Sequence, residues 1–515
     1  MPGSRRRAPV PALPAQGGPF HYDRLSAQDA TFLDLEGPSA PQHVAATVVL
    51  RSGSLRTRAG GIDIERVRDY VASRLHLIPR YRQRLARVPI EGHPVWVDDA
   101  HFQIDFHVRH TALPHPGDRR QLKRLSGRIL SQPLDRQRPL WELWVVEGLE
   151  GGDRFAIVQK SHHAMIDGIS GVDLMAVLMR GAPDEKFEPG PAWQPRRAPK
   201  AAELLEAELR RRATDALRLL GSGPQALQAP RAFLGSLLEG VEAVAETLGA
   251  GLRPASNTPL NRPLGPHRSF DWLDMKLADV KQVKDRLGGT VNDVVLATVA
   301  GALRRFLERR RIDVDGLRLR ANVPVSVRSD DERGRLGNRI ALWMTDLPVH
   351  ERDPLERLAR VRETTARLKA SRQALGAEVL AAVSDWTSSS ILSLAVRGSA
   401  RGRPYNVVVT NVPGPQIPLY LLGAEVEACY PVVNLQPKQG LGIALFSYAG
   451  GLFWGFVADP EIVPDLDTIP GLVAASFAEL AEAAGTDLAA APAQTLPAPS
   501  RRPRARVTRP RSRKS

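Results

Sequence analysis

The chain has 515 residues, which is more than a single hydrophobic core usually supports, so two domains are expected. Hydrophobic residues make up 43% of the chain and charged residues 25%, which excludes a wholly disordered or fibrous protein. The single cysteine, Cys429, excludes an intramolecular disulfide and a cysteine-cluster metal site. The formal net charge of +15 is concentrated at one end, since residues 501–515 hold eight Lys or Arg and no acidic residue.

Residues 1–20 and 481–515 have the composition of disordered tails. The first of them lacks the apolar core of a signal peptide, so secretion by that route is not expected. Three interpretations of the basic tail stay open. It could attract anionic lipid headgroups at about 1 kcal/mol per basic residue, it could contact nucleic acid non-specifically, or it could simply be solvated.

Two uncharged windows approach the length of a membrane span. Residues 406–424 are interrupted by three prolines, and residues 440–458 contain "SYAGGLF", which is typical of a hairpin turn. An open strand end cannot pair its backbone groups in hydrocarbon. Both windows are therefore expected to be buried strands, and no transmembrane helix is expected.

Residues 21–180 alternate between strand and helix signals and are expected to form an N-terminal domain. The apolar, β-branched run "HVAATVVL" (43–50) predicts a strand. Asp63 is expected to cap a helix with one apolar face. That face consists of Ile64, Val67, Val71 and Leu75.

A hairpin is expected later in this domain, where "ELWVVEGL" and "RFAIVQK" predict two strands joined by "EGGD" (150–153). The second strand leads directly to His162 and His163. The apolar segment "GVDLMAVLM" that follows Ser170 predicts a helix.

The next region, residues 181–266, is expected to be a Pro-rich crossover linker that contains two helices, residues 201–220 and 231–248. Residues 267–480 are expected to form a C-terminal domain. "VNDVVLATVAGALRRFLERR" predicts a helix, because Thr290 and Asp293 form a capping-box pattern at its start. "YNVVVTNV" predicts a strand. Alternation of strands and helices in both halves predicts an α/β (mixed α+β) fold in two domains.

The segment "SHHAMIDGIS" (161–170) combines two adjacent histidines with Asp167 and Gly168. A neutral imidazole can take a proton from a hydroxyl group that attacks a carbonyl carbon, which is typically worth about 10²–10⁴ in rate. Asp167 could hold the loop or the ring, and Gly168 lets the chain turn without steric cost. The alternative is an ordinary polar turn with two satisfied histidines; the apolar strand before the pair favours the functional interpretation.

Other chemistries lack their motifs. The chain has no G-x-S-x-G elbow, no P-loop and no H-E-x-x-H, so a serine hydrolase or a zinc hydrolase is not supported. His162 and His163 would be a poor chelating pair, because adjacent side chains on a strand point to opposite faces. We therefore expect no metal site.

The spacing of residues 162–168 is the HHxxxDG motif of the chloramphenicol-acetyltransferase-like superfamily, which includes condensation domains of peptide synthetases and plant hydroxyl acyltransferases. Further ordered blocks resemble the bacterial wax ester synthase/diacylglycerol O-acyltransferase family, and the resemblance covers about residues 25–480. The blocks are "LSAQDATFLDLEGPSAPQHV" (25–44), "PLW" (139–141), "ND" (292–293), "PVSVRSDDERGRLGN" (324–338) and "NVPGP" (411–415).

This resemblance implies two chloramphenicol-acetyltransferase-like domains with the active site between them. It implies direct transfer of a long acyl group from acyl-CoA to a diacylglycerol or a fatty alcohol, without a covalent acyl-enzyme. Acyl-CoA would be a co-substrate, and no cofactor is expected. His163 would be the general base, supported by His162, Asp167 and Gly168.

The remaining site residues come from the same motifs and stay open. Asn292 and Asp293 match the family's N-D element, but Asp293 is equally expected as a capping-box acid. Trp141 is expected to pack in the core rather than to do chemistry. Asn411 could fix a turn or point into the site. Arg328 is a candidate partner for Asp167.

A lipid acceptor predicts an apolar tunnel or cleft and access from a lipid surface. We expect a cytoplasmic protein, peripheral at the inner face of the plasma membrane or on lipid droplets, with no specific nucleic-acid partner. The sequence predicts no oligomeric state. Two alternatives remain: a carrier-protein-dependent, condensation-type acyltransferase, and a non-catalytic lipid-surface protein of the same fold.

Overall fold

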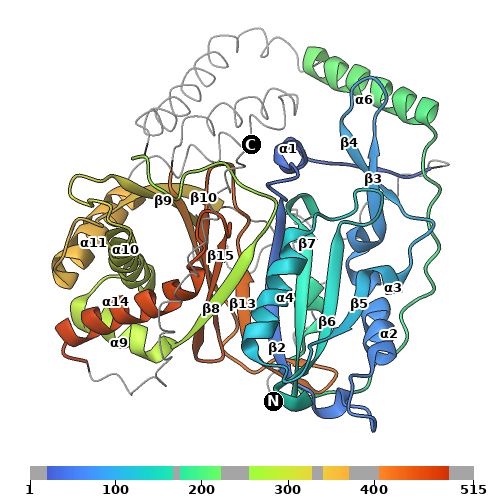
Figure 1. The fold of residues 1–515 in the computed structure, drawn as a ribbon. Helices are drawn as coiled ribbons and strands as arrows, with labels where there is room; N and C mark the ends of the chain where they lie inside the picture. Colours follow the sequence, from blue (N-terminus) through green and yellow to red (C-terminus); the bar gives the residue numbers. More distant parts are fainter. Residues whose placement is uncertain (1–19, 166–173, 222–254, 327–339, 371–404, 487–515) are drawn as a thin grey trace, which may run out of the picture.

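The computed structural model describes residues 20–165, 174–221, 255–326, 340–370 and 405–486. In these residues the chain forms two six-stranded sheets in two lobes that lie side by side, and a smaller three-stranded sheet (Figure 1). The fold is mixed helix and sheet, as predicted.

The first sheet contains the strand that carries the two histidines. β7 lies in its interior between β2 and β6, and only the β5–β6 pair is parallel among the strand pairs described in this sheet. The strand order is β12 (Tyr420–Leu421), β13 (Ala424–Val432), β2 (His43–Arg51), β7 (Arg154–His162), β6 (Trp141–Leu149) and β5 (Val108–Ala112).

Helices of the first lobe bury apolar faces as the sequence predicts. Asp63 caps α2 by accepting a hydrogen bond from the Arg66 backbone N–H, and Val67 and Val71 are fully buried. The other helices before the crossover are α1 (Ala27–Leu35), α3 (Ile104–His107), α4 (Arg119–Ser131) and α5 (Leu174–Leu178), while α2 spans Ile64–Arg74.

The second sheet carries its helices on one side (Figure 1). β11 is parallel to both β9 and β14, and the other pairs are antiparallel. The strand order is β10 (Ile340–Leu347), β9 (Leu319–Ser326), β11 (Val407–Pro413), β14 (Leu441–Tyr448), β15 (Gly451–Ala458) and β8 (Ser269–Lys276). The helices described in this lobe are α9 (Leu277–Leu287), α10 (Val291–Arg309), α11 (Pro354–Ala370) and α14 (Ile469–Ala483).

The predicted hairpins and strands of both lobes are confirmed. β6 and β7 pair across the Glu150–Gly152 turn, and β14 and β15 pair across the turn after Tyr448. The two uncharged windows therefore contain strands, and no helix in the described part of the chain is long and apolar enough to span a bilayer.

The predicted crossover helix α6 (Ala201–Gly221) is also present, and its Leu204 packs on the small sheet. That sheet has the order β1 (Asp23–Arg24), β4 (Pro94–Asp98) and β3 (Gln83–Arg87). The second helix expected in the crossover lies outside the described residues.

One strand ties the two lobes together. β13 follows β11 in the chain, yet it pairs with β2 of the first sheet, from Val426↔Leu50 to Val432↔Ala45. The ring of Tyr430 on β13 stacks on Trp272 of β8, with centroids 4.5 Å apart. Gly455 of β15 allows this approach, because an added Cβ would lie 1.8 Å from the Pro431 carbonyl oxygen.

The expected domain boundaries stay a prediction, and the sheets do not divide the chain in the same way. β12 and β13 belong to the first sheet although they lie within the segment expected as the C-terminal domain. At the other boundary, α14 continues to Ala483, past the expected start of the tail at residue 481, and Thr486 is buried. Residues 1–19 and 487–515 lie outside the described part of the chain.

Candidate active site at the end of strand β7

The two histidines lie where β7 ends and a short 3₁₀ turn, His163–Met165, begins. His162 is the last residue of the strand and pairs with His43 of β2. Because side chains alternate along a strand, the two imidazoles point in different directions. His162 is fully buried, whereas His163 is partly exposed.

The ring of His163 is fixed by stacking. It lies on the phenyl ring of Phe32 from α1, with centroids 3.8 Å apart and an angle of 18° between the planes. Its backbone N–H donates to the Gln42 carbonyl oxygen at 2.8 Å. Its Nδ1 atom is buried without a hydrogen-bond partner among the described residues. The imidazole is therefore held in place largely by an apolar neighbour.

Burial determines the protonation of His163. Removal from water, and to a smaller extent the neighbouring His162, lowers the pKa of His163 from 6.5 to about 4. At neutral pH the ring is therefore uncharged and able to accept a proton. This is the state that a general base requires.

His162 lies next to an acidic residue, Glu36, the C-cap of α1. Its Nδ1 accepts a hydrogen bond from the Ala164 backbone N–H at 3.0 Å, and its Nε2 lies 3.5 Å from Glu36 Oε1. Arg136 donates to Glu36 Oε2 from both Nε (2.9 Å) and Nη2 (2.6 Å). Burial alone would raise the pKa of Glu36, but His162 and Arg136 together lower it to about 2.

The second half of the chain also supports this turn. Gln42, whose carbonyl binds the His163 N–H, is itself fully buried. Its side-chain oxygen accepts hydrogen bonds from Asn434 Nδ2 (2.6 Å) and Gln436 Nε2 (3.1 Å), just after β13. The position of His163 therefore depends on both halves of the chain.

Two other candidates have clear structural positions. Trp141 is fully buried, stacks on His107 with centroids 4.6 Å apart, and donates from Nε1 to the Tyr81 carbonyl oxygen at 2.8 Å. Asp293 completes the capping box of α10 with Thr290 and accepts a hydrogen bond from Thr365 Oγ1 at 2.7 Å. The packing role of Trp141 and the capping role of Asp293 are confirmed.

The remaining candidates are less constrained. Asn292 is half-buried at the start of α10, and Asn411 is half-buried on β11 opposite Leu445 of β14. Asp167, Gly168 and Arg328 lie outside the described residues. The site roles of all these residues stay predictions.

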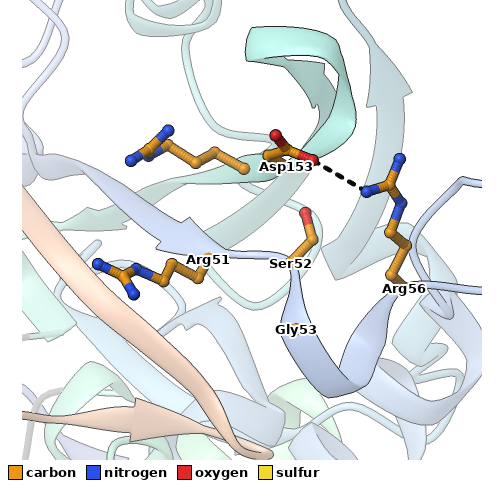
Figure 2. Close-up of a pocket in the computed structure, with 6 residues that line it drawn as sticks. Arg51, Ser52, Gly53, Arg56 and Asp153 are labelled. Carbon is orange, nitrogen blue, oxygen red and sulfur yellow. Dashed lines mark hydrogen bonds and ion pairs between the residues drawn. The ribbon is translucent and has the colours of Figure 1, made fainter.

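The pocket drawn in Figure 2 is a separate feature. It is lined by Arg51, Arg56, Arg154 and neighbouring residues, and Figure 2 shows the ion pair between Arg56 and Asp153. Arg51 pairs with Arg154 at the opposite end of β2 and β7 from the His43–His162 pair. Its guanidinium-rich walls do not suit an acyl chain, so we do not place the reaction there.

Comparison with known proteins identifies the family of this chain. Residues 25–295 match the wax ester synthase/diacylglycerol acyltransferase catalytic domain, and residues 336–481 match the C-terminal domain of the same family. A Mycobacterium tuberculosis protein provisionally named a diacylglycerol O-acyltransferase is 36% identical over 462 residues, which cover 88% of this chain and 89% of that protein.

The chain belongs to the wax ester synthase/diacylglycerol acyltransferase family. It is therefore an acyltransferase.

Solved structures agree with the family's fold. The wax ester synthase/diacylglycerol acyltransferase of Marinobacter aquaeolei is 26% identical, with a TM-score of 0.66 over 90% of this chain and 100% of that one. The first condensation domain of the CDA synthetase is 18% identical, with a TM-score of 0.52 over 90% of this chain and 98% of that one, and shares the fold. The predicted two-domain, chloramphenicol-acetyltransferase-like fold is thereby confirmed.

Three residues of this candidate site were not predicted from the sequence: Phe32, Glu36 and Arg136. Phe32 and Glu36 lie in the first family block, but nothing local distinguishes them from other apolar and acidic residues. Glu36 meets Arg136 across 100 positions of sequence. A pairing signal between distant positions would have been needed to find this contact.

The buried histidines predict loss of stability in mild acid. Burial is the main reason that the pKa values of His43, His107 and His163 fall from 6.5 to about 3, 4 and 4. Between about pH 6.5 and 4 the unfolded chain binds protons at these residues that the folded protein does not. The free energy of unfolding should fall by up to about 1.4 kcal/mol per pH unit for each histidine.

Thermal unfolding measured from pH 7.5 to 4.5 checks this expectation. The midpoint temperature should decrease as the pH is lowered below about 6.5. In His107→Gln this decrease per pH unit should be smaller. Equal midpoints at pH 7 and pH 5 would contradict the low pKa values of the buried imidazoles.

Proposed function

We propose that this acyltransferase moves a long-chain acyl group from acyl-CoA to the hydroxyl of a diacylglycerol or a fatty alcohol, with His163 as general base. The observation that carries this proposal is the uncharged, partly exposed imidazole fixed on Phe32 at the end of β7. The match to the catalytic domain of the family supports the substrate classes.

In the proposed reaction, His163 takes the proton of the acceptor hydroxyl as that oxygen attacks the thioester carbonyl carbon. The carbon–sulfur bond then breaks, and the imidazolium returns the proton to the leaving thiolate of CoA. Acyl-CoA and alcohol become ester and free CoA, so the step needs no cofactor and no covalent acyl-enzyme. The negative charge that develops on the carbonyl oxygen favours the transient imidazolium beside it.

The low pKa of His163 has a cost and a benefit for this step. A weakly basic imidazole provides less driving force for removal of the proton. However, it remains unprotonated at pH values well above about 4. Placement of the two substrates must then supply much of the rate, which fits a site built between two halves of the chain.

A second candidate follows from the shared fold. Condensation domains have the same architecture, so a carrier-bound acyl donor is the alternative to free acyl-CoA. A non-catalytic lipid-surface protein is the other alternative. The acyl donor that the protein accepts distinguishes the three functions. The proposed enzyme uses free acyl-CoA, a condensation-type enzyme uses a carrier-bound acyl group, and a non-catalytic protein uses neither.

Substitution of the base tests the proposal. Wild-type protein is given palmitoyl-CoA with diolein or hexadecanol, and release of free CoA is followed with a thiol reagent. His163→Ala should lower kcat by about 10²–10⁴, while His162→Ala should lower it less. His110→Ala, on the exposed side of β5, is the control and should keep wild-type activity.

Two outcomes would count against this account. No CoA release with either acceptor, from folded wild-type protein, would refute acyl-CoA-dependent transfer. A larger loss in His162→Ala than in His163→Ala would refute the assignment of the base.

We also propose that the protein works at a lipid surface, because its expected acceptors are insoluble in water. The basic segment 501–515 would add electrostatic attraction to anionic headgroups.

Vesicle binding tests this second proposal. The full chain should co-sediment with phosphatidylglycerol-containing vesicles, and deletion of residues 501–515 should weaken binding, most clearly at low salt. Phosphatidylcholine vesicles provide the uncharged control. Equal binding of both proteins to the anionic vesicles would exclude the tail as an anchor.

A further inference from the structure

The hydrogen bonds of His162 fix where its ring proton lies. Its Nδ1 accepts a hydrogen bond from the Ala164 N–H, and a nitrogen that accepts such a bond carries no proton. The proton of the ring is therefore on Nε2. The Glu36 carboxylate lies 3.5 Å from this atom, which is longer than a normal hydrogen bond, so the attraction is mainly electrostatic.

Glu36 is itself held from several directions. Its Oε2 accepts two hydrogen bonds from the Arg136 guanidinium, and its Oε1 accepts one from the Gln42 backbone N–H at 3.2 Å. Arg136 also donates from Nη2 to the Leu33 carbonyl oxygen at 2.8 Å. The carboxylate can therefore neither rotate away from His162 nor leave the end of α1 without loss of several bonds.

We infer that Glu36, held by Arg136, is a positioning residue for the base: it keeps His162 in the Nε2-protonated form and thereby fixes the turn that presents His163. The inference rests on the proposed function, because it assigns a purpose to the geometry around His163. Glu36 does not touch the substrate in this account and acts only through His162.

The physical reason lies in the turn itself. Ala164 is buried, and its N–H is bonded to His162 Nδ1 within the 3₁₀ turn that contains His163. If the proton moved to Nδ1, two donors would face each other and the Ala164 N–H would lose its partner. The turn would then have to shift, and the His163 ring would shift with it.

The same ion pair constrains His163 from a second side. Arg136 joins Glu36 and Leu33 at the C-terminal end of α1, and α1 carries the Phe32 ring on which His163 stacks. The Arg136 guanidinium thus holds both the helix that carries Phe32 and the Glu36 carboxylate that sets the tautomer of His162. The planar guanidinium of arginine suits this position because it can donate two hydrogen bonds to the carboxylate in a fixed geometry.

Glu36→Gln is the sharpest test. The amide has the same shape, but its oxygen should turn to Arg136 and leave its NH₂ group facing two donors, His162 Nε2–H and the Gln42 N–H. We expect kcat for CoA release to fall by about 10²-fold because the base is misplaced. The KM for palmitoyl-CoA should change little, because no substrate contact is removed.

A second readout does not depend on activity. In protein labelled with ¹⁵N-histidine, the His162 signals of the wild type should show a protonated Nε2 and an unprotonated Nδ1. In Glu36→Gln this pattern should be lost or mixed with the other tautomer. A residue with only a general structural role would not change the tautomer of one histidine.

Glu427→Gln is the matched control. Like Glu36, Glu427 accepts arginine hydrogen bonds, here from Arg51 (2.6 Å) and Arg154 (2.5 Å), but it lies at the other end of β2 and β7. The Glu427→Gln variant should keep the wild-type kcat and the wild-type tautomer of His162. If Glu36→Gln does not fold, Arg136→Lys replaces it; loss of two-point contact should lower kcat while the lysine keeps its positive charge.

Either of two results would overturn the inference: wild-type kcat in folded Glu36→Gln, or a His162 tautomer that is the same in both proteins. For Arg136→Lys, wild-type kcat would overturn it. Failure of the proposed function looks different, because wild-type protein would then release no CoA while the tautomer experiment would still report on Glu36.

Discussion

Strand β7 lies in the interior of the first sheet, and its pairing with β2 and β6 fixes the direction of every side chain along it. At its end this alternation sends His162 into the protein and leaves His163 beside Phe32. A slip of one residue in register would exchange the two imidazoles. The candidate chemistry therefore depends on the sheet as much as on the histidines themselves.

Charged groups buried next to this strand form hydrogen bonds and ion pairs that offset the cost of removing them from water. Lys160 of β7 is fully buried, yet its Nζ donates to the carbonyl oxygens of Ile129 and Gln132 at the end of α4 and lies 3.3 Å from Glu142. Glu36 and Arg136 balance each other beside His162 in the same way. His163 has no such oppositely charged partner among the described residues, so burial is the main reason that its imidazole is neutral. The buried charges of Lys160 and Glu36 thus have partners of opposite charge, whereas the imidazole of His163 has none in the described part of the chain. This difference is the electrostatic basis of the proposed mechanism.

Local features of the fold could be predicted from the sequence, and long-range pairings could not. The Asp63 and Thr290 caps, the two hairpins and the strand before the histidines all leave signals within a few residues. The pairing of β13 with β2 has no such signal, because its partners are hundreds of residues apart in the chain. For the site, the motif predicted the histidines correctly as neighbours on a strand end. It did not predict Glu36, whose importance appears only when α1, β7 and the loop after α4 come together.

The central claim is that His163 meets the acceptor hydroxyl and the thioester in one place. The most direct measurement is a crystal structure with a non-cleavable thioether analogue of palmitoyl-CoA and a fatty alcohol. The account predicts the alcohol oxygen within about 2.6–3.2 Å of a His163 ring nitrogen, with the acyl carbon next to that oxygen. Binding of both ligands away from the end of β7, for example at the Arg51–Arg154 pocket, would contradict it.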